Sequence, residues 1–428
     1  MECNLSSFDD MTAGSLVQYK ILDGMYESIA PTTSNNSTIE FRVHSAEHFI
    51  ELDKTELEIF FRVKKADNGN LAAQEKVSII NYPGATMFKD IEVALNDKTI
   101  TYAGSNYAER AIMETLLSFG KDAGKSWLQA GLYYKDTAGK MDAAEPNPAD
   151  AATTNDGLKE RGKFLENSQL VHTKAKLHLD IFNQPKALIN NVRMVLKLTR
   201  ATNSYVLMSS EVNAAYKVDI EKVYLNVRKV KVADDVIESI AKQSIPYPIT
   251  RVIQKECTIP SGGKTFTENN LWDDVLPTKV VFGLVLNTAH VGSYTENPFN
   301  YQNFDVSNVC LRENGQVIDG RTLSLDFDNN QYVDGFWSLQ RALDQRFRDE
   351  GSQISRTDYK DGYALYAFDL SPSQCTDQFI DPAKRGKLTL ELQFAKPIPK
   401  TLTLCVYLQF EASIIINEVR EVFTKFSG

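Results

Sequence analysis

Apolar and polar residues alternate along several short stretches of this 428-residue chain. In the clearest one, Thr55–Lys64, every second side chain is apolar: Leu57, Ile59, Phe61 and Val63. Successive side chains of a strand point to opposite faces, so this alternation predicts a β-strand with one buried face. Short strands of this kind, separated by turn residues, are typical of a β-sandwich or barrel. The same period recurs at residues 39–43, 91–95, 177–181, 192–198 and 223–227.

Three stretches follow the helical period instead. The first helix is predicted over Tyr107–Phe119, with Asn106 as its N-cap, Glu109 completing a capping box and Gly120 ending it. Its apolar stripe consists of Ala108, Ile112, Leu116 and Phe119.

The second helix is predicted over Asp334–Phe347, and a short third one over Asp234–Lys242. The stripe of the second helix consists of Phe336, Leu339, Leu343 and Phe347. Ser244–Pro248 follows the third helix and carries two prolines, which neither a helix interior nor a central strand tolerates. We therefore place a domain boundary here.

The same order of elements occurs twice along the chain. In the first half, the strand Thr55–Lys64 leads to another strand, a tight turn at Asn96-Asp97 and the first helix. In the second half, a strand at Thr278–Asn287 leads to a further strand, a turn at Asn314-Gly315 and the second helix. Three more strands follow each helix, near 171–182, 191–199 and 216–232 in the first half and near 363–370, 386–394 and 401–416 in the second. This order indicates an internal duplication.

The two turns suggest which sandwich is repeated. Asn-Gly and similar pairs favour tight hairpins because both central residues adopt positive φ. In the eight-stranded jelly roll, with strands lettered B to I, the E–F link is such a hairpin. We therefore predict an all-β fold of two tandem eight-stranded jelly rolls, each with a helix in its F–G connection. The predicted domains are residues 1–232, with an N-terminal arm of about residues 1–35, a connector at 233–248, and residues 249–428.

The long connection after the first helix is predicted to be an exposed loop. Its segment Ala143–Gly157 has no aromatic residue and no sustained apolar period. Such a segment buries too little apolar surface to become fully ordered.

Composition narrows the function. The chain is 43% hydrophobic and has a formal net charge of −9, which argues against a protein that itself coats nucleic acid. Its cysteines are scattered and form no C-x-x-C pair: Cys3, Cys257, Cys310, Cys375 and Cys405. Neither a disulfide framework nor a zinc ribbon is indicated. The N-terminal residues do not resemble a secretory signal, so we expect synthesis inside the host cell rather than secretion.

Two short motifs resemble ligand sites but depart from them. Gly120–Ser126 lacks the spacing of a phosphate-binding loop and follows a helix rather than a strand. Asp326–Asn330 begins like a calcium-binding loop, but Gln331 replaces its turn glycine and Trp337 stands where a glutamate is needed. We interpret both segments as solvated loops.

Cupin enzymes are also jelly rolls, and they bind a metal through an H-x-H pair with a further glutamate and histidine. The histidines of this chain contain no such pair: His44, His48, His172, His178 and His290. His172 and His178 are six positions apart around a predicted strand and should face the same side. Asp273-Asp274 is too common a pattern in an acidic chain to indicate a glycosidase. The sequence therefore predicts no catalytic, cofactor-binding or metal-binding residues.

Three stretches carry a resemblance to a known family: Met87–Asp122, Leu276–Asn287 and Asn297–Ile318. With the duplicated order of elements, they resemble the double-jelly-roll major capsid proteins, and more narrowly those of Polinton (Maverick) elements and adintoviruses. This resemblance implies a structural protein of the virion and not an enzyme. Three copies would form a trimeric, pseudo-hexagonal capsomer of an icosahedral shell around double-stranded DNA.

The resemblance also implies partners. These are further copies of the chain, neighbouring capsomers and a penton protein with a single jelly roll, with the packaged DNA contacted only indirectly. Two other interpretations stay open at this point. One is a carbohydrate-binding or glycan-processing protein with two sandwiches, and the other is a domesticated cellular descendant of a capsid gene.

Overall fold

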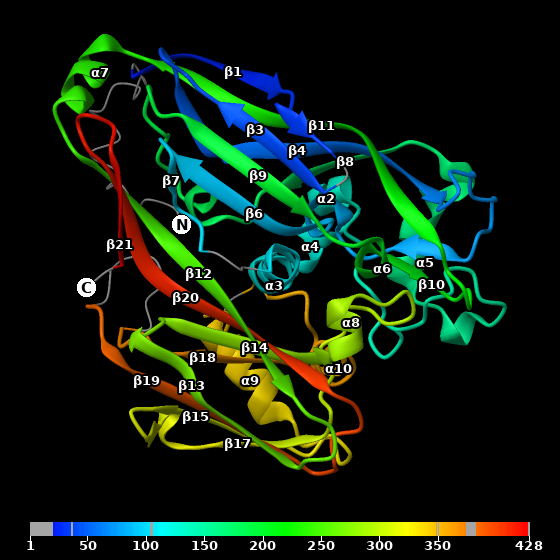
Figure 1. Cartoon of the computed structure of the whole chain (residues 1–428). Helices are drawn as coiled ribbons and strands as arrows, with labels where there is room; N and C mark the ends of the chain where they lie inside the picture. The colour runs from blue at the N-terminus through cyan, green and yellow to red at the C-terminus, as the bar shows by residue number, and fades with distance from the viewer. Residues whose placement is uncertain are drawn as a thin grey trace, which may run out of the picture.

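The computed structural model describes residues 20–35, 37–102, 106–347, 349, 351–373 and 382–426. Most of the predicted N-terminal arm, and with it Cys3, lies outside the described residues, as does Cys375. The strands gather into two sandwiches, one in the first half of the chain and one in the second (Figure 1).

The first half contains two large antiparallel sheets, ordered β1-β11-β4-β8 and β2-β3-β9-β6-β7, beside a small sheet of β5 and β10. In jelly-roll letters these large sheets are B-I-D-G and C-H-E-F, with β2 as an addition. Their strands are β1 (Ile21–Ile29), β2 (Thr33–Ser34), β3 (Thr38–Val43), β4 (Phe49–Lys65), β5 (Val77–Ile79), β6 (Phe88–Leu95), β7 (Lys98–Thr99), β8 (Val171–Lys176), β9 (Met194–Arg200), β10 (Leu207–Ser209) and β11 (Tyr216–Val232).

The second half repeats this topology. Its sheets are ordered β12-β20-β14-β18 and β13-β19-β15-β16, again B-I-D-G and C-H-E-F, with β21 and β17 as additions. The strands are β12 (Ile245–Ile259), β13 (Thr265–Val275), β14 (Lys279–Leu286), β15 (Val306–Glu313), β16 (Gln316–Val317), β17 (Leu323–Ser324), β18 (Leu365–Asp369), β19 (Arg385–Phe394), β20 (Leu402–Ile416) and β21 (Val422–Phe426). The predicted double jelly roll is therefore confirmed.

The helices are short and lie mostly in the connections. They are α2 (Pro83–Thr86), α3 (Tyr107–Ser118), α4 (Lys121–Gly124), α5 (Asp156–Lys163), α6 (Asn203–Val206), α7 (Asp234–Ala241), α8 (Asn287–Val291), α9 (Val333–Ala342) and α10 (Arg356–Lys360). The predicted first and third helices agree with α3 and α7.

The two E–F hairpins are equivalent in detail. Asn96 and Asp97 have φ of 45° and 66°, and Asn314 and Gly315 have φ of 50° and 83°. In each hairpin the asparagine Oδ1 accepts a hydrogen bond from a backbone N–H at the start of the neighbouring H strand or directly before it. The donor is the Arg193 N–H at 2.8 Å in the first half and the Lys387 N–H at 2.9 Å in the second.

Three predicted element boundaries differ from the structure. Residues 21–29, expected in the arm, form strand β1 against β11. Strand β8 ends at Lys176, so the alternating residues 177–181 are buried but lie outside any strand. Strand β12 contains both Pro246 and Pro248, which is tolerated because β12 is an edge strand.

The second helix is shorter than predicted. It ends at Ala342, and Phe347, predicted to lie on its apolar stripe, is 94% exposed. Asp344 and Phe347 adopt positive φ, which is incompatible with a continuing right-handed helix.

Candidate functional site

Helix α3 lies between the two sandwiches (Figure 1). Ten of its twelve residues are buried, so it has no broad solvent-facing side. Carbonyl groups of its last turns accept hydrogen bonds from side chains of the second half, at 3.3 Å from Gln353 Nε2 to Thr115 O and at 3.0 Å from Gln345 Nε2 to Leu117 O. The helix therefore contributes directly to the contact between the two halves.

Arg110 of α3 organises a buried ionic network. Its Nε lies 2.7 Å from Glu114 Oε1, and a terminal nitrogen lies 2.8 Å from Asp180 Oδ1. His178 Nδ1 lies 2.9 Å from the second oxygen of Glu114. Burial opposes ionisation of Glu114, but the charge of Arg110 and the contact with His178 outweigh it and lower the pKa of Glu114 to about 2.

The second sandwich contributes to the same network. The Tyr407 hydroxyl of β20 donates to Glu114 Oε1 at 3.3 Å, and the Val252 N–H of β12 donates to Asp180 at 3.3 Å. A cleft of about 880 Å³ opens beside Glu114 and Tyr407. Because Glu114 is held ionised by its partners, the geometry is that of a structural ion pair and not of a general acid.

A second buried network ties the long F–G connection of the first half to the second sandwich. The fully buried Arg161 pairs with Asp136 at 2.6 Å. Asp136 in turn accepts from Asn297 Nδ2 at 3.1 Å, and its carbonyl accepts from the Tyr363 hydroxyl at 2.7 Å. Asn155, within the segment Ala143–Gly157, donates through Nδ2 to Asp136 Oδ1 at 3.0 Å, so this part of the predicted loop also contacts the network.

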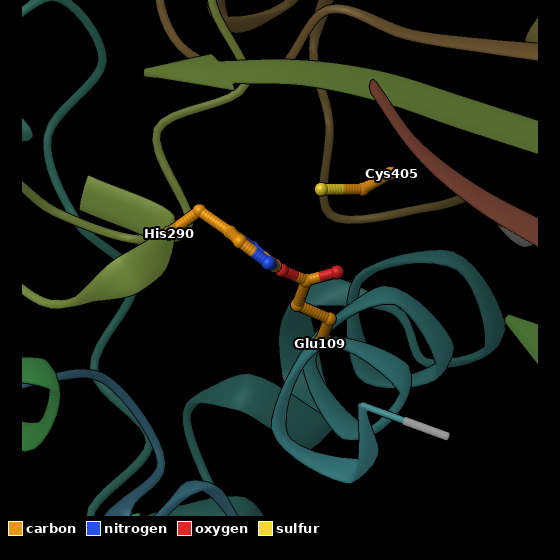
Figure 2. A group of neighbouring side chains, drawn as sticks. All are labelled: Glu109, His290 and Cys405. Carbon is orange, nitrogen blue, oxygen red and sulfur yellow. The ribbon is translucent and has the colours of Figure 1, made fainter. Parts of the chain in front are cut away.

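A third cluster contains the groups with the most varied chemistry. His290 of α8 lies between two carboxylates, with Nδ1 2.7 Å from Glu109 Oε1 of α3 and Nε2 3.0 Å from Glu256 of β12. The side chain of Cys405, from β20, points toward the same carboxylate of Glu109 (Figure 2). One ligand atom from each of Glu109, His290 and Cys405 can be chosen so that all three lie within 4.8 Å of one another.

The surroundings shift the titration of this cluster. Burial disfavours the charged form of His290, but its hydrogen bonds to Glu109 and Glu256 outweigh this effect and raise its pKa to about 10. Burial raises the pKa of the Cys405 thiol well above its usual range, and the charge of Glu109 adds to the rise. At neutral pH the histidine is therefore an imidazolium between two carboxylates, and Cys405 is a neutral thiol.

Two predictions from the sequence about residues near these clusters differ from the structure. The side chain of Asn106 makes no N-cap hydrogen bond, and the capping box predicted for Glu109 was wrong, because its carboxylate contacts His290 instead. His172 and His178 do not face one side, since β8 ends between them: His172 is exposed beside Glu58, whereas His178 is buried.

The two segments interpreted as loops hold no comparable group. Lys121–Gly124, within the phosphate-loop-like segment, forms the one-turn helix α4. Asp326 contacts Asn329, and Asp328 pairs with Lys396 at 2.8 Å. Among the described residues, Glu109, His290 and Cys405 are the one set of three metal-ligating side chains found close together.

Strand β1 presents apolar side chains to solvent. It pairs with β11 along one edge, and its other edge is not paired with a described strand. Leu22, Met25 and Tyr26 are each about half exposed. An edge strand that carries exposed apolar residues favours contact with another protein surface.

Sequence comparison relates the chain to a protein of a nematode. No family model matches the chain. A protein of Caenorhabditis elegans described as uncharacterized is 26% identical over 354 residues, which cover 80% of this chain and 80% of that protein. In the described residues, no helix is long and apolar enough to cross a membrane.

Solved structures match over nearly the whole length. A chain of the Sputnik virophage gives a TM-score of 0.67 at 12% identity, covering 100% of this chain and 92% of that chain. The mavirus major capsid protein gives 0.55 at 12% identity, covering 94% and 90%. The Faustovirus major capsid protein gives 0.52 at 10% identity, covering 98% and 94%. The chain thus has the double-jelly-roll fold of viral major capsid proteins.

Proposed function

We propose that this protein is a major capsid protein, a structural and non-enzymatic subunit of a virion. The observation that carries the proposal is the match over both sandwiches and their connections to the major capsid proteins of mavirus and Faustovirus. Two independent jelly rolls could each arise in many proteins, but their tandem arrangement across 94% and 98% of the chain favours a shared architecture. Fold alone does not assign function, so the proposal also draws on the surface of the molecule.

The geometry of one chain suits a pseudo-hexagonal tile. Each chain supplies two sandwiches of the same topology, so a trimer presents six similar sandwiches around a threefold axis. The exposed side chains of β1 are candidates for contact with a second copy. The net charge of −9 favours indirect contact with packaged double-stranded DNA through other proteins.

The proposed partners follow from this role. They are two further copies in the capsomer, neighbouring capsomers of an icosahedral shell, and a single-jelly-roll penton protein at the vertices. The relative in Caenorhabditis elegans supports an origin in an element integrated into an animal genome, such as a Polinton. It equally favours a second candidate, a domesticated descendant of such a capsid gene.

Light scattering on the purified full chain tests the assembly. We expect a species of three times the chain mass at micromolar concentration in neutral buffer of moderate salt. Met25→Lys on β1 should shift this species toward the monomer, whereas Val212→Lys, at another exposed apolar residue, should leave it unchanged. A monodisperse wild-type monomer would contradict the capsomer, and a trimer unaffected by Met25→Lys would remove β1 from its interface.

Electron microscopy separates the two candidates. Co-expression with the other structural proteins of the same element should give closed shells if the chain is a working capsid protein. A domesticated descendant should form trimers but no shells under the same conditions.

A further inference from the structure

We propose that Glu109, His290 and Cys405 form a zinc-binding site that joins the two sandwiches within one chain. The three ligands come from different elements, namely α3 in the first half and α8 and β20 in the second (Figure 2). An ion at this position would cross-link α3 to the second sandwich. This role is separate from assembly between chains.

The donor set suits zinc. Zn²⁺ is borderline-soft and binds thiolate, imidazole and carboxylate ligands together, whereas magnesium and calcium prefer oxygen ligands alone. Tetrahedral bonds of about 2.0 to 2.3 Å place donor atoms roughly 3.3 to 3.7 Å apart. The present donors lie within 4.8 Å of one another, and Glu109 Oε1 is 2.7 Å from His290 Nδ1. Side-chain adjustments of about 1 Å would therefore bring them around one ion.

Glu256 provides the outer contact that a zinc-bound histidine usually has. Metal-ligating histidines almost always donate their other ring N–H to a carboxylate or carbonyl, which fixes the ring and its tautomer. Here Nδ1 lies 2.7 Å from Glu109 Oε1, while Nε2 lies 3.0 Å from Glu256. Asn106 Nδ2 in turn contacts the other oxygen of Glu256 at 3.5 Å. The arrangement is that of a carboxylate–histidine–metal triad.

Two buried tyrosines lie in the same electrostatic environment. The hydroxyls of Tyr205 and Tyr301 have no hydrogen-bond partner among the described residues, although both side chains are more than nine-tenths buried. Burial raises the pKa of both phenols well above the usual range, and the charge of Glu109 raises it further.

Proton balance is simple. Binding releases the thiol proton of Cys405 and the Nδ1 proton of His290 to solvent, and no oxidation or reduction takes place. The buried ion pair between His290 and Glu109 is replaced by bonds from both groups to the ion. The positive charge of the ion then neutralises the carboxylate and the thiolate.

The test uses the full chain, freed of metal with a chelator and kept under a phosphine reductant. Zn²⁺ affinity and stoichiometry are measured by competition with a chromophoric chelator, and Co²⁺ replaces Zn²⁺ for absorption spectroscopy. We expect one ion per chain, a near-ultraviolet thiolate-to-cobalt band and tetrahedral d–d bands. Zinc should raise the midpoint of thermal unfolding by about 2 to 5 °C.

Variants distinguish the proposed zinc ligands from residues that do not bind the ion. Cys405→Ser should abolish the thiolate band, whereas Cys310→Ser, at another buried cysteine, should retain it. Glu256→Gln should keep the stoichiometry but weaken binding by about 10- to 100-fold, as expected for a contact outside the coordination sphere. Circular dichroism before metal addition checks that each variant is folded. A wild-type chain that retains no zinc, or a thiolate band that survives in folded Cys405→Ser, would overturn the proposal.

Discussion

Helices α3 and α9 occupy the same place in the two jelly rolls, in the connection after strand F, but they are used differently. α9 packs along its own sandwich, where Leu339 is fully buried and Ser338 Oγ donates to Ala367 O of β18 at 2.6 Å. Its other face is open to solvent, and Trp337 is half exposed. α3 is instead buried on nearly all sides and carries charged residues into the contact with the other sandwich.

This difference shows what a helix of a duplicated domain requires when it packs against a second domain as well as its own. A helix that covers only its own sheet needs one apolar stripe and tolerates polar residues elsewhere. A helix between two sandwiches must find a partner for every polar group that it buries. Arg110 and Glu114 meet most of this requirement through each other, through Asp180 and His178, and through Tyr407 of the second half, although one terminal nitrogen of Arg110 is buried without a hydrogen bond.

The largest predicted effect compares an arginine on each helix. Arg110→Met leaves the carboxylates of Glu114 and Asp180 buried without their main counter-charge, so we expect a loss of about 3 to 5 kcal/mol in the free energy of unfolding. Arg341→Met on α9 removes a pair with Asp319 nearer the surface and should cost about 0 to 1 kcal/mol. Urea unfolding measures both. Equal losses would show that the two helices do not differ in the way proposed.

A pH effect of intermediate size follows from Glu114. Its folded pKa of about 2 lies below its ordinary value of 4.5, so its contribution is fully present above about pH 4.5 and is lost as pH falls toward 2. The loss should be on the order of 3 kcal/mol. Stability of the wild type is compared with that of Glu114→Gln between pH 6 and pH 2.5, as approximate limits set by this titration.

The comparison with the variant is needed because Asp180 has the opposite dependence. Burial raises its pKa in spite of Arg110, so its protonation at low pH partly offsets the loss from Glu114. The difference in free energy of unfolding between the wild type and Glu114→Gln reports the contribution of Glu114 alone. If this difference does not become smaller as pH falls, the Glu114 carboxylate is not held ionised by this network.

The smallest predicted effect concerns substitutions that exchange the second turn residue between the two hairpins. Asp97 adopts φ of 66° at the position where the second half has Gly315, with φ of 83°. Glycine reaches this region without strain, so Asp97→Gly should stabilise the chain and Gly315→Asp destabilise it, each by about 0.5 to 1 kcal/mol. Thermal unfolding of the single and exchanged variants checks this. A gain in stability for Asp97→Gly, a loss of similar size for Gly315→Asp and no net change in the double variant would support the equivalence of the hairpins.

Much of the fold could be predicted because it depends on short-range patterns. Alternation marks strands such as Thr55–Lys64, and positive-φ residue pairs mark both hairpins. Boundaries failed where tertiary contacts decide them. Strand β8 stops before His178 because the following residues turn inward to join the Arg110 network, and β12 runs through two prolines because it lies at a sheet edge.

The candidate site could not be predicted in the same way. Glu109 looks like a capping residue, since it stands three positions after Asn106. Its actual partners, His290 and Cys405, come from distant parts of the sequence, and no local pattern links the three. The buried network around Asp136 could not be predicted for a related reason, because its partners Asn297 and Tyr363 belong to the other sandwich.

The position of β20 in its sheet has a consequence for the synthesis of the chain. This strand pairs with β12 on one side and β14 on the other, and it supplies Cys405 and Tyr407 to the contact with α3. It spans Leu402–Ile416, so it is synthesised after α3 and after strands β12 to β19 of the second jelly roll. Until β20 is made, α3 lacks its contacts with that strand, and its charged side chains Arg110 and Glu114 are more exposed to water. The two halves can therefore complete their contact at α3 only after β20 has been synthesised.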